Sequence, residues 1–150
     1  NNCPVCSILM AWADADQKER WLKALARGAT LGAFRLTEPH AGSDVGSAST
    51  QAKKRPDGKY DIKGTKIFIS GGDQDMSEGI LHLVLARTGD AASGTRGLSL
   101  FACLSDLPDG TRNEVSVTRI EEKLGLHASP TCQLAFDGAN FTRMDAASGR

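Results

Sequence analysis

A surplus of charge of either sign is missing from this sequence. Lysine and arginine together number 18, and so do aspartate and glutamate, so the formal net charge of the 150 residues is zero. A net positive field attracts nucleic acids and anionic membrane surfaces, so charge gives no argument for either partner. The one dense basic run, Lys53 to Arg55, stands before the turn residues Pro56-Asp57-Gly58, and we interpret it as a solvated turn.

Long hydrophobic runs are also missing. The longest are far shorter than the roughly 18 residues of a transmembrane helix, and no signal-peptide pattern is visible. Cys3 and Cys6 have C-x-x-C spacing, but no second such pair and no His pair completes a metal-ligand set. We therefore interpret these two, with Cys103 and Cys132, as free thiols of a cytoplasmic protein, and we assign no metal site.

Aromatic residues are scarce, at 5%, whereas glycine is abundant, with 16 residues. Many glycines between short β-branched runs are typical of a protein of strands and turns. The sequence begins without Met and opens on a hydrophobic stretch, Val5 to Trp12, that no cap or turn precedes. We therefore expect a segment of a longer protein, about one domain in size.

Helical patterns are confined to the first 28 residues. Residues 5–13 are expected to end one helix, and residues 16–27 to form a second that Gly28 stops. Asp14 to Asp16 offer its N-cap, and Asp16 with Glu19 resembles a capping box. After Gly28 the hydrophobic pattern becomes that of strands. The expected strands cover residues 30–36, 49–53, 60–63, 65–70, 80–86, 98–103, 115–120 and 132–136.

These patterns predict a mainly β fold, an antiparallel β-barrel or sandwich of about eight strands with a short N-terminal helical segment. Gly64 is expected to turn the chain between two strands. In the strand that follows, Lys66, Phe68 and Ser70 alternate with Ile67 and Ile69, which predicts two opposite faces. The stretch from Asn140 to Arg150 is polar and patternless, so we expect it to fray.

Three stretches stand out for their chemistry. Residues 37–44, Thr-Glu-Pro-His-Ala-Gly-Ser-Asp, form a loop with hydroxyls, a glycine and free backbone N–H groups. Such a loop can cradle a phosphate or the polar edge of a ring, although taken alone it could be a simple turn. The other two stretches are residues 64–71, Gly-Thr-Lys-Ile-Phe-Ile-Ser-Gly, and residues 123–131, Lys-Leu-Gly-Leu-His-Ala-Ser-Pro-Thr, followed by Leu-Ala-Phe-Asp at 134–137.

In this order and spacing, the three stretches resemble the middle domain of the acyl-CoA dehydrogenase family. The segment from Phe68 to Arg87 is most similar to the larger branch that includes methylmercaptopropionyl-CoA dehydrogenase-like enzymes, and the turn of residues 107–113 also resembles that branch and its alkylation-response flavoprotein relatives. His127 stands where many members carry Arg, so no role is transferred to it. The resemblance divides the chain into a remnant of the N-terminal helical domain (1–28), the middle β-domain (29–138) and a disordered or frayed tail (139–150).

The resemblance implies FAD-dependent α,β-dehydrogenation of an acyl-CoA thioester by the whole protein. In the family, a carboxylate from the C-terminal helical domain removes the α-proton, and a hydride passes to flavin N5. No residue of this chain matches that base, so we assign no catalytic residue. We therefore expect the isolated chain to bind FAD weakly or not at all and to be inactive.

The resemblance also assigns flavin contacts by position. Phe68 would pack on the isoalloxazine, and Thr37 and Ser70 would reach its polar edge, where charge builds as the hydride arrives. Without the resemblance, Phe68 could be an ordinary core aromatic and Ser70 a strand-end hydroxyl. The cofactor-binding residues expected are Phe34, Leu36, Thr37, Gly42, Ser43, Phe68, Ile69 and Ser70, and Ser43 is also assigned to the substrate.

Two other functions remain open at this point. A relative of the alkylation-response flavoproteins would associate with DNA through a region outside this chain. A non-catalytic structural β-domain would assemble with partners through apolar surface. For the dehydrogenase, the implied partners are an acyl-CoA substrate, an electron-transferring flavoprotein and further copies in a homo-oligomer.

Overall fold

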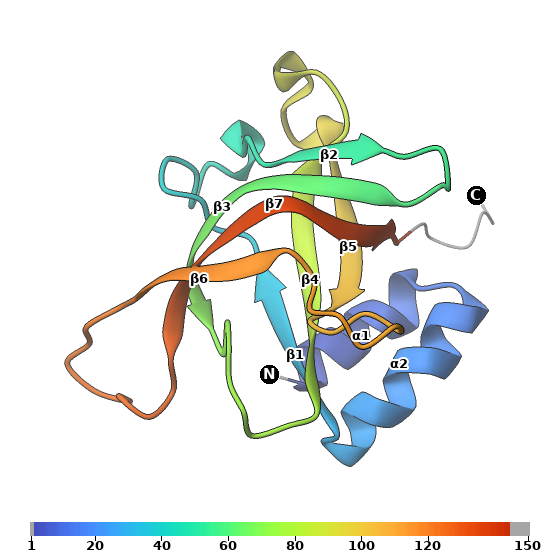
Figure 1. Cartoon of the computed structure of the whole chain (residues 1–150). Coiled ribbons are helices and arrows are strands. Elements are labelled where there is room, and N and C mark those ends of the chain that lie inside the picture. The colour runs from blue at the N-terminus through green and yellow to red at the C-terminus, as the bar shows by residue number, and fades with distance from the viewer. Residues whose placement is uncertain (1, 145–150) are drawn as a thin grey trace.

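Two helices lie beside seven strands in the structure, a computed structural model that describes residues 2–144 (Figure 1). The helices are α1 (Asn2–Trp12) and α2 (Ala15–Arg27). The strands are β1 (Thr30–Arg35), β2 (Gln51–Lys54), β3 (Tyr60–Ser70), β4 (Gly79–Arg87), β5 (Leu98–Leu104), β6 (Val115–Ile120) and β7 (Thr131–Arg143). Short 3-10 helices, η1 (Val45–Ser47) and η2 (Ala91–Gly97), lie in the connections. Neither α1 nor α2 is long and apolar enough to cross a membrane.

Helix α2 begins at Ala15, one residue earlier than predicted, and Asp14 is its N-cap. The Asp14 side chain accepts a hydrogen bond from the backbone N–H of Gln17 at 2.7 Å, and the Gln17 side chain accepts one from the Asp14 backbone N–H at 3.1 Å. The cap is therefore the first of the residues offered for it, Asp14 to Asp16, but the capping box expected from Asp16 with Glu19 is wrong, because Asp16 lies in the first turn. Gly28 ends the helix with φ 74°, as predicted, because glycine adopts this left-handed conformation without steric cost.

All seven strands belong to one mixed sheet. Strands β1 and β4 pair in parallel, β2 meets β4 in a parallel pairing at Gln51 and Arg87, and the remaining pairings are antiparallel. The mainly β fold is therefore confirmed, but the fully antiparallel arrangement is wrong. The chain between β1 and β4 contains the β2–β3 hairpin, and it returns β4 beside β1 in the same direction.

The strand pairings also form a closed circuit. They run from β4 through β2, β3, β7 and β5 back to β4. Strand β1 pairs with β4 along the same edge that β2 meets at Arg87, and β6 pairs with β7. A circuit of this kind encloses side chains from alternate positions of each strand.

The two predicted strands at residues 60–63 and 65–70 form one continuous strand, β3. Gly64 does not turn the chain but continues β3, where an added Cβ would lie 2.5 Å from Oγ1 of Thr50. The glycine therefore permits close approach of the Thr50 segment. The pairing of β3 with β7 shifts register between Ile62 and Lys63, and β3 continues through this irregularity. The sheet consequently has seven strands rather than about eight.

Strand β7 extends well beyond its predicted end. It continues to Arg143, and the side chains of Ala139 and Phe141 are fully buried. Residues 139–143 therefore form a paired strand, so the prediction of a frayed tail is wrong for them. Their inward positions alternate with the polar residues Asn140 and Thr142, a period of two that is too short to recognise among polar neighbours. The rest of the predicted tail, 145–150, lies outside the described residues.

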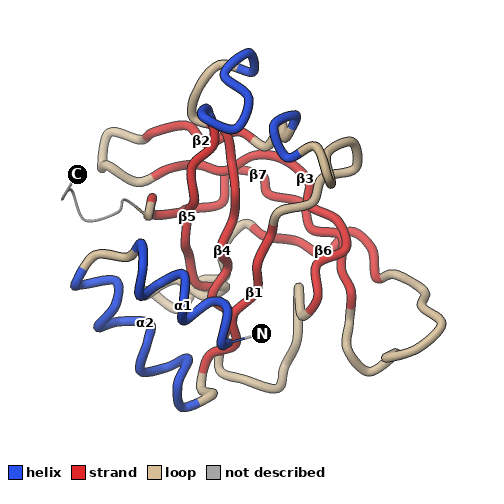
Figure 2. The backbone as a smooth tube through the Cα atoms, turned by 180° about the vertical axis from the view of Figure 1, so that it is seen from behind, coloured by secondary structure: helices blue, strands red, loops and turns tan. Residues whose placement is uncertain are grey.

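Apolar side chains pack on both faces of the sheet. Strand β4 shows the division, because Leu81 and Leu83 pack with the helices whereas Val84 and Ala86 belong to the core enclosed by the strands. Figure 2 shows the two helices lying against one side of the sheet. The outer cluster joins Val5, Leu9, Trp21 and Leu25 of the helices to Leu81, Leu83 and Ala102.

Candidate functional site

Phe68 has an unusual backbone conformation near the end of β3. Its φ is 57°, a region that costs most L-residues on the order of 1–3 kcal/mol. The pairing of β3 with β7 is interrupted between Lys66 and Ile69, and the Phe68 side chain is 61% exposed. The interpretation of Phe68 as a core aromatic is therefore wrong. A strained, exposed aromatic at a strand irregularity is typical of functional sites.

Three of the predicted site residues surround one hollow. Phe34 from β1 and both Phe68 and Ser70 from β3 line a space of about 280 Å³. The rest of its wall comes from the first turns of α1, with Pro4, Val5 and Ile8. Phe34 is itself 41% exposed, so two aromatic faces are presented to the same space. An apolar wall with a hydroxyl at its margin suits a flat ring that has apolar faces and polar edges.

A buried ion pair anchors the loop that follows β1. Nζ of Lys66 lies 2.7 Å from Oε1 of Glu38, and the two side chains are 0% and 2% exposed. The same ammonium donates to the carbonyl of Leu36 at 3.0 Å. The Glu38 carboxylate also accepts the backbone N–H groups of Ser49 at 2.7 Å and Thr50 at 3.1 Å. The loop is therefore attached both to β3 and to the segment that enters β2.

The hydrogen bonds keep this pair charged. Burial alone would raise the pKa of Glu38, but the bonds from Lys66, Thr50 and Ser49 outweigh burial and hold that pKa at about 2. Burial lowers the pKa of Lys66, and the Glu38 carboxylate offsets part of that effect. Neither residue was among the predicted site residues. A signal was available, because both stand inside the matched motifs and charged side chains are fully buried only when paired.

The loop lies next to the Phe68 segment. The Ile67 backbone N–H donates to the carbonyl of Thr37 at 2.9 Å, which joins the start of the loop to the interruption in β3. A Cβ on Gly42 would lie 3.8 Å from Cγ2 of Thr37, so the far end of the loop returns beside its start. Leu36 and Thr37 are half-buried, and Gly42 and Ser43 are exposed. These four residues follow Phe34 in the sequence, but none of them lines the hollow.

Ile69 differs from the other predicted cofactor residues. Its side chain is 3% exposed and packs in the enclosed core with Cys132 and Leu134. The side chain of Ile69 therefore does not reach a ligand in the hollow, and the predicted cofactor contact would come from its backbone. The next residue, Ser70, is exposed and lines the hollow.

Comparison with known proteins identifies the family of this chain. Residues 33–139 match the family model described as acyl-CoA dehydrogenase, middle domain. The chain belongs to the acyl-CoA dehydrogenase family. The match covers Phe34, the anchored loop and the Phe68 segment, and it confirms the family resemblance that the three sequence motifs indicated.

Individual relatives agree with the family match. The 3-methylmercaptopropionyl-CoA dehydrogenase of Ruegeria pomeroyi is 43% identical over 143 residues, which is 92% of this chain and 24% of that protein. The structure of butyryl-CoA dehydrogenase from Megasphaera elsdenii covers 96% of this chain and matches over 36% of its own, with 31% identity and a TM-score of 0.79. A glutaryl-CoA dehydrogenase from Mycobacterium smegmatis, solved in complex with FADH2, covers 97% of this chain and matches over 34% of its own, with 28% identity and a TM-score of 0.74. This middle domain thus spans only part of the length of each acyl-CoA dehydrogenase that it resembles.

Proposed function

We propose that the protein containing this middle domain catalyses FAD-dependent α,β-dehydrogenation of an acyl-CoA thioester, and that this chain forms one face of the flavin site. The proposal is supported above all by the exposure and the backbone strain of Phe68. Its side chain is 61% exposed on a strained backbone beside a hollow that Phe34 and Ser70 also line. Strain and exposure of a large apolar group are costly in a domain that has no ligand for it.

The residues of the hollow fit a flavin. Phe34 and Phe68 would pack on the isoalloxazine and exclude water, while the hydroxyls of Thr37 and Ser70 would donate to its polar edge. Ile69 and Leu36 would contribute backbone groups to the same edge. Gly42 would allow close backbone approach, and Ser43 would face the pyrophosphate or the pantetheine arm of the substrate. When bound, FAD supplies the hydride acceptor of the reaction.

The proposal leaves the catalytic base outside this chain. The residues that line the hollow in the described part of the chain carry no carboxylate, and the Glu38 carboxylate of the adjoining loop is buried and hydrogen-bonded to Lys66, Ser49 and Thr50. We therefore propose that the isolated chain binds FAD weakly or not at all and does not dehydrogenate substrate. An electron-transferring flavoprotein as acceptor, a homo-oligomeric assembly and a cytoplasmic location belong to the same proposal, the last supported by four free cysteines.

The test uses the parent protein and its Phe68→Ala variant. We expect the parent protein to copurify with flavin and to reduce a dye only when an acyl-CoA is added. In the variant, the dissociation constant for FAD, measured by flavin fluorescence, should rise roughly threefold to tenfold, the value of one aromatic contact. Met10→Ala removes an equally exposed apolar side chain from α1, outside the residues that line the hollow, and should leave FAD binding unchanged.

Either of two outcomes would contradict the proposal. Parent protein that binds FAD but shows no acyl-CoA-dependent dye reduction would exclude the dehydrogenase. Equal FAD affinity in the parent protein and in the Phe68→Ala variant would remove Phe68 from the flavin site. A titration of the isolated chain with FAD, with its folding checked by circular dichroism, would show how much of the site this domain forms alone.

A further inference from the structure

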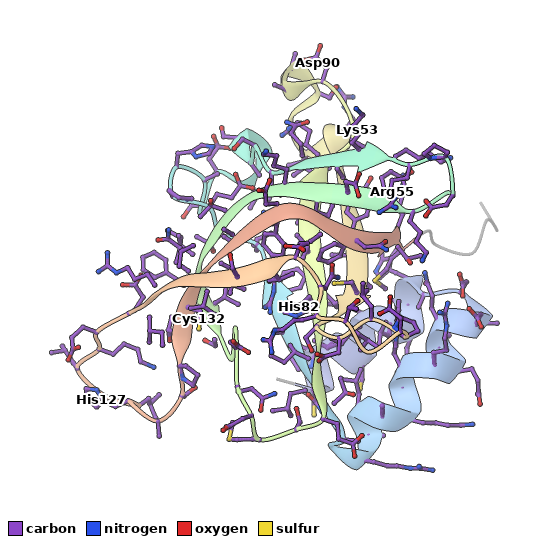
Figure 3. All side chains as sticks on the ribbon, viewed as in Figure 1. Lys53, Arg55, His82, Asp90, His127 and Cys132 are labelled. Atoms are coloured by element: carbon purple, nitrogen blue, oxygen red, sulfur yellow. The ribbon has the colours of Figure 1, made fainter. Side chains whose placement is uncertain are left out.

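A cluster of polar side chains that the dehydrogenase proposal does not use lies inside the sheet. Arg35 of β1, His82 of β4 and Cys103 of β5 are 0%, 2% and 6% exposed. His82 stands directly opposite Cys103 in the β4–β5 pairing and beside Ala33 in the β1–β4 pairing, so the three strands bring these groups together. Figure 3 shows His82 in the interior that the strands enclose.

Several nitrogen atoms of this cluster have no protein partner. Nη2 of Arg35 donates to the carbonyl of Gly72 at 3.1 Å, but within residues 2–144 no protein group accepts from its Nε or Nη1. Both ring nitrogens of His82 are likewise without a protein partner in that range. A buried donor left unpaired costs about 1–3 kcal/mol, and more when it is charged. Such a set of unpaired nitrogens indicates a bound water or ion.

The charge of this cluster is positive. Burial lowers the pKa of Arg35 to about 9, which still leaves the guanidinium protonated at neutral pH. Burial raises the pKa of Cys103, so this thiol is neutral and does not balance the guanidinium. Burial, with Arg35 and Arg112 nearby, lowers the pKa of His82, so its imidazole is neutral and keeps one N–H donor. The Asp73 carboxylate, which acts on Arg35 from a distance, already lies 2.7 Å from Nη2 of Arg112.

A small void adjoins His82, with a path to solvent. Gly72, Asp73, His82, Ser105 and Arg112 line it, together with apolar side chains, and its volume of about 10 Å³ has room for one species near the size of a water molecule. Asp73 and Arg112 also line an open groove of about 500 Å³. Their ion pair, with side chains 41% and 58% exposed, therefore separates the void from solvent.

We propose that this interior site binds one small monatomic anion, of which chloride is the physiological example. The N–H of His82 holds the anion in the void, and the guanidinium of Arg35, which donates to the carbonyl of the lining residue Gly72, balances its charge from beside the void. The anion enters past the ion pair of Asp73 and Arg112. A guanidinium whose charge is not balanced by the surrounding protein favours an anion over a neutral water at the same position. The site lies in the enclosed core, whereas Phe34 and Phe68 are on the opposite, outward side of their strands.

The test compares chloride with gluconate, an anion too large for the void, at equal ionic strength and neutral pH. We expect the unfolding temperature of the 150-residue chain to be higher in chloride by about 3 °C at a tenfold excess over the dissociation constant. Arg35→Met should abolish this difference. Arg20→Met removes the same charge from an exposed position on α2 and should retain it. Equal unfolding temperatures of the unaltered chain in the two salts would overturn the proposal, as would an unchanged chloride effect in Arg35→Met.

A second variant covers the case in which Arg35→Met does not fold. His82→Leu keeps the guanidinium but removes the N–H donor, and it should weaken chloride binding roughly tenfold, the loss of one hydrogen bond to a charged group. The readout is the line width of the chloride NMR signal, titrated with each chain. Line broadening that is the same for the unaltered chain and for His82→Leu would show that chloride binds elsewhere and would contradict the proposed site.

Discussion

At the scale of single residues, the interruption in β3 determines which side chains reach the hollow. In a regular strand, Lys66 and Phe68 share one face because side chains alternate. Here Lys66 is fully buried and Phe68 is 61% exposed, since the residues between Lys66 and Ile69 leave the β7 register and Phe68 adopts a positive φ. One local irregularity therefore sends the ammonium inward to Glu38 and the aromatic ring outward.

Lys66→Met tests the importance of the buried ion pair. The substitution leaves the Glu38 carboxylate buried without its cation, so we expect the free energy of unfolding to fall by about 3–5 kcal/mol. The double variant Lys66→Met with Glu38→Gln removes both charges and should recover more than half of the loss. Urea denaturation of the four chains gives the coupling energy. A double variant as unstable as the sum of the single variants would show that the two charges do not interact.

The pH dependence of stability provides an independent test of the same pair. The pKa of Glu38 is about 2 in the folded chain and 4.5 in its ordinary environment, so ionisation of this group favours folding above pH 4.5. That contribution, on the order of 3 kcal/mol, should be lost as the pH falls from 4.5 toward 2. Lys66 is protonated in both states throughout this range, so its lowered pKa adds no slope. Unfolding free energies measured across the acid range should show the loss in the unaltered chain, and Glu38→Gln should show a clearly smaller slope.

At the scale of secondary-structure elements, one glycine sets the distance between α1 and β1. A Cβ on Gly32 would lie 2.6 Å from Cγ2 of Val5, closer than side-chain atoms approach. Val5 is buried in the outer cluster and also lines the hollow with Phe34. The position of the helix, and with it one wall of the candidate flavin site, therefore depends on the absence of a side chain in β1.

Gly32→Ala should displace α1 and lower the free energy of unfolding by about 1–3 kcal/mol, the usual cost of overpacking. Adding Val5→Ala frees space beside the new methyl group and should reverse part of the effect of Gly32→Ala, measured by thermal or urea denaturation. Gly125→Ala is the matched control, because no atom lies within 4 Å of its added Cβ. If Gly32→Ala were as stable as Gly125→Ala, the close packing of α1 on β1 would not limit stability.

At the scale of the whole molecule, the last residues of β7 close the circuit of strands. Ala102 of β5 pairs with Thr142, and Phe101 with Arg143, while Phe141 is buried in the enclosed core with its ring 5.9 Å from that of Phe136. Without this segment, β5 would pair only with β4. The stability of the enclosed core, and of the proposed anion site within it, should therefore depend on residues that follow the family match, which ends at residue 139.

Phe141→Ala should lower the free energy of unfolding by about 3–5 kcal/mol, because it leaves a cavity in a closed core. Amide hydrogen exchange should show lost protection along both β5 and β7. Phe34→Ala deletes the same ring from a position 41% exposed and should cost roughly 1 kcal/mol or less. Comparable costs for the two substitutions would mean that residues 139–143 contribute little to closing the sheet.

Much of this protein could be predicted from short stretches of sequence. The helices, most strand positions, the turn at Gly28 and the loop from Thr37 to Asp44 all depend on residues within a few positions of one another, where hydrophobic period and turn chemistry act directly. The family was recognisable for the same reason, since its motifs are continuous in sequence. The sequence by itself therefore determined which segments form strands and which loop belongs to the candidate site.

Only the tertiary structure decided how those segments meet. The parallel pairing of β1 with β4, the extension of β7 to Arg143 and the positive φ of Phe68 depend on strands tens of residues apart. The buried pair of Glu38 with Lys66 and the cluster of Arg35 with His82 have the same origin. A charged side chain in the sequence shows no preference for the inside or the outside of a sheet until its partner, or a ligand, is brought to it.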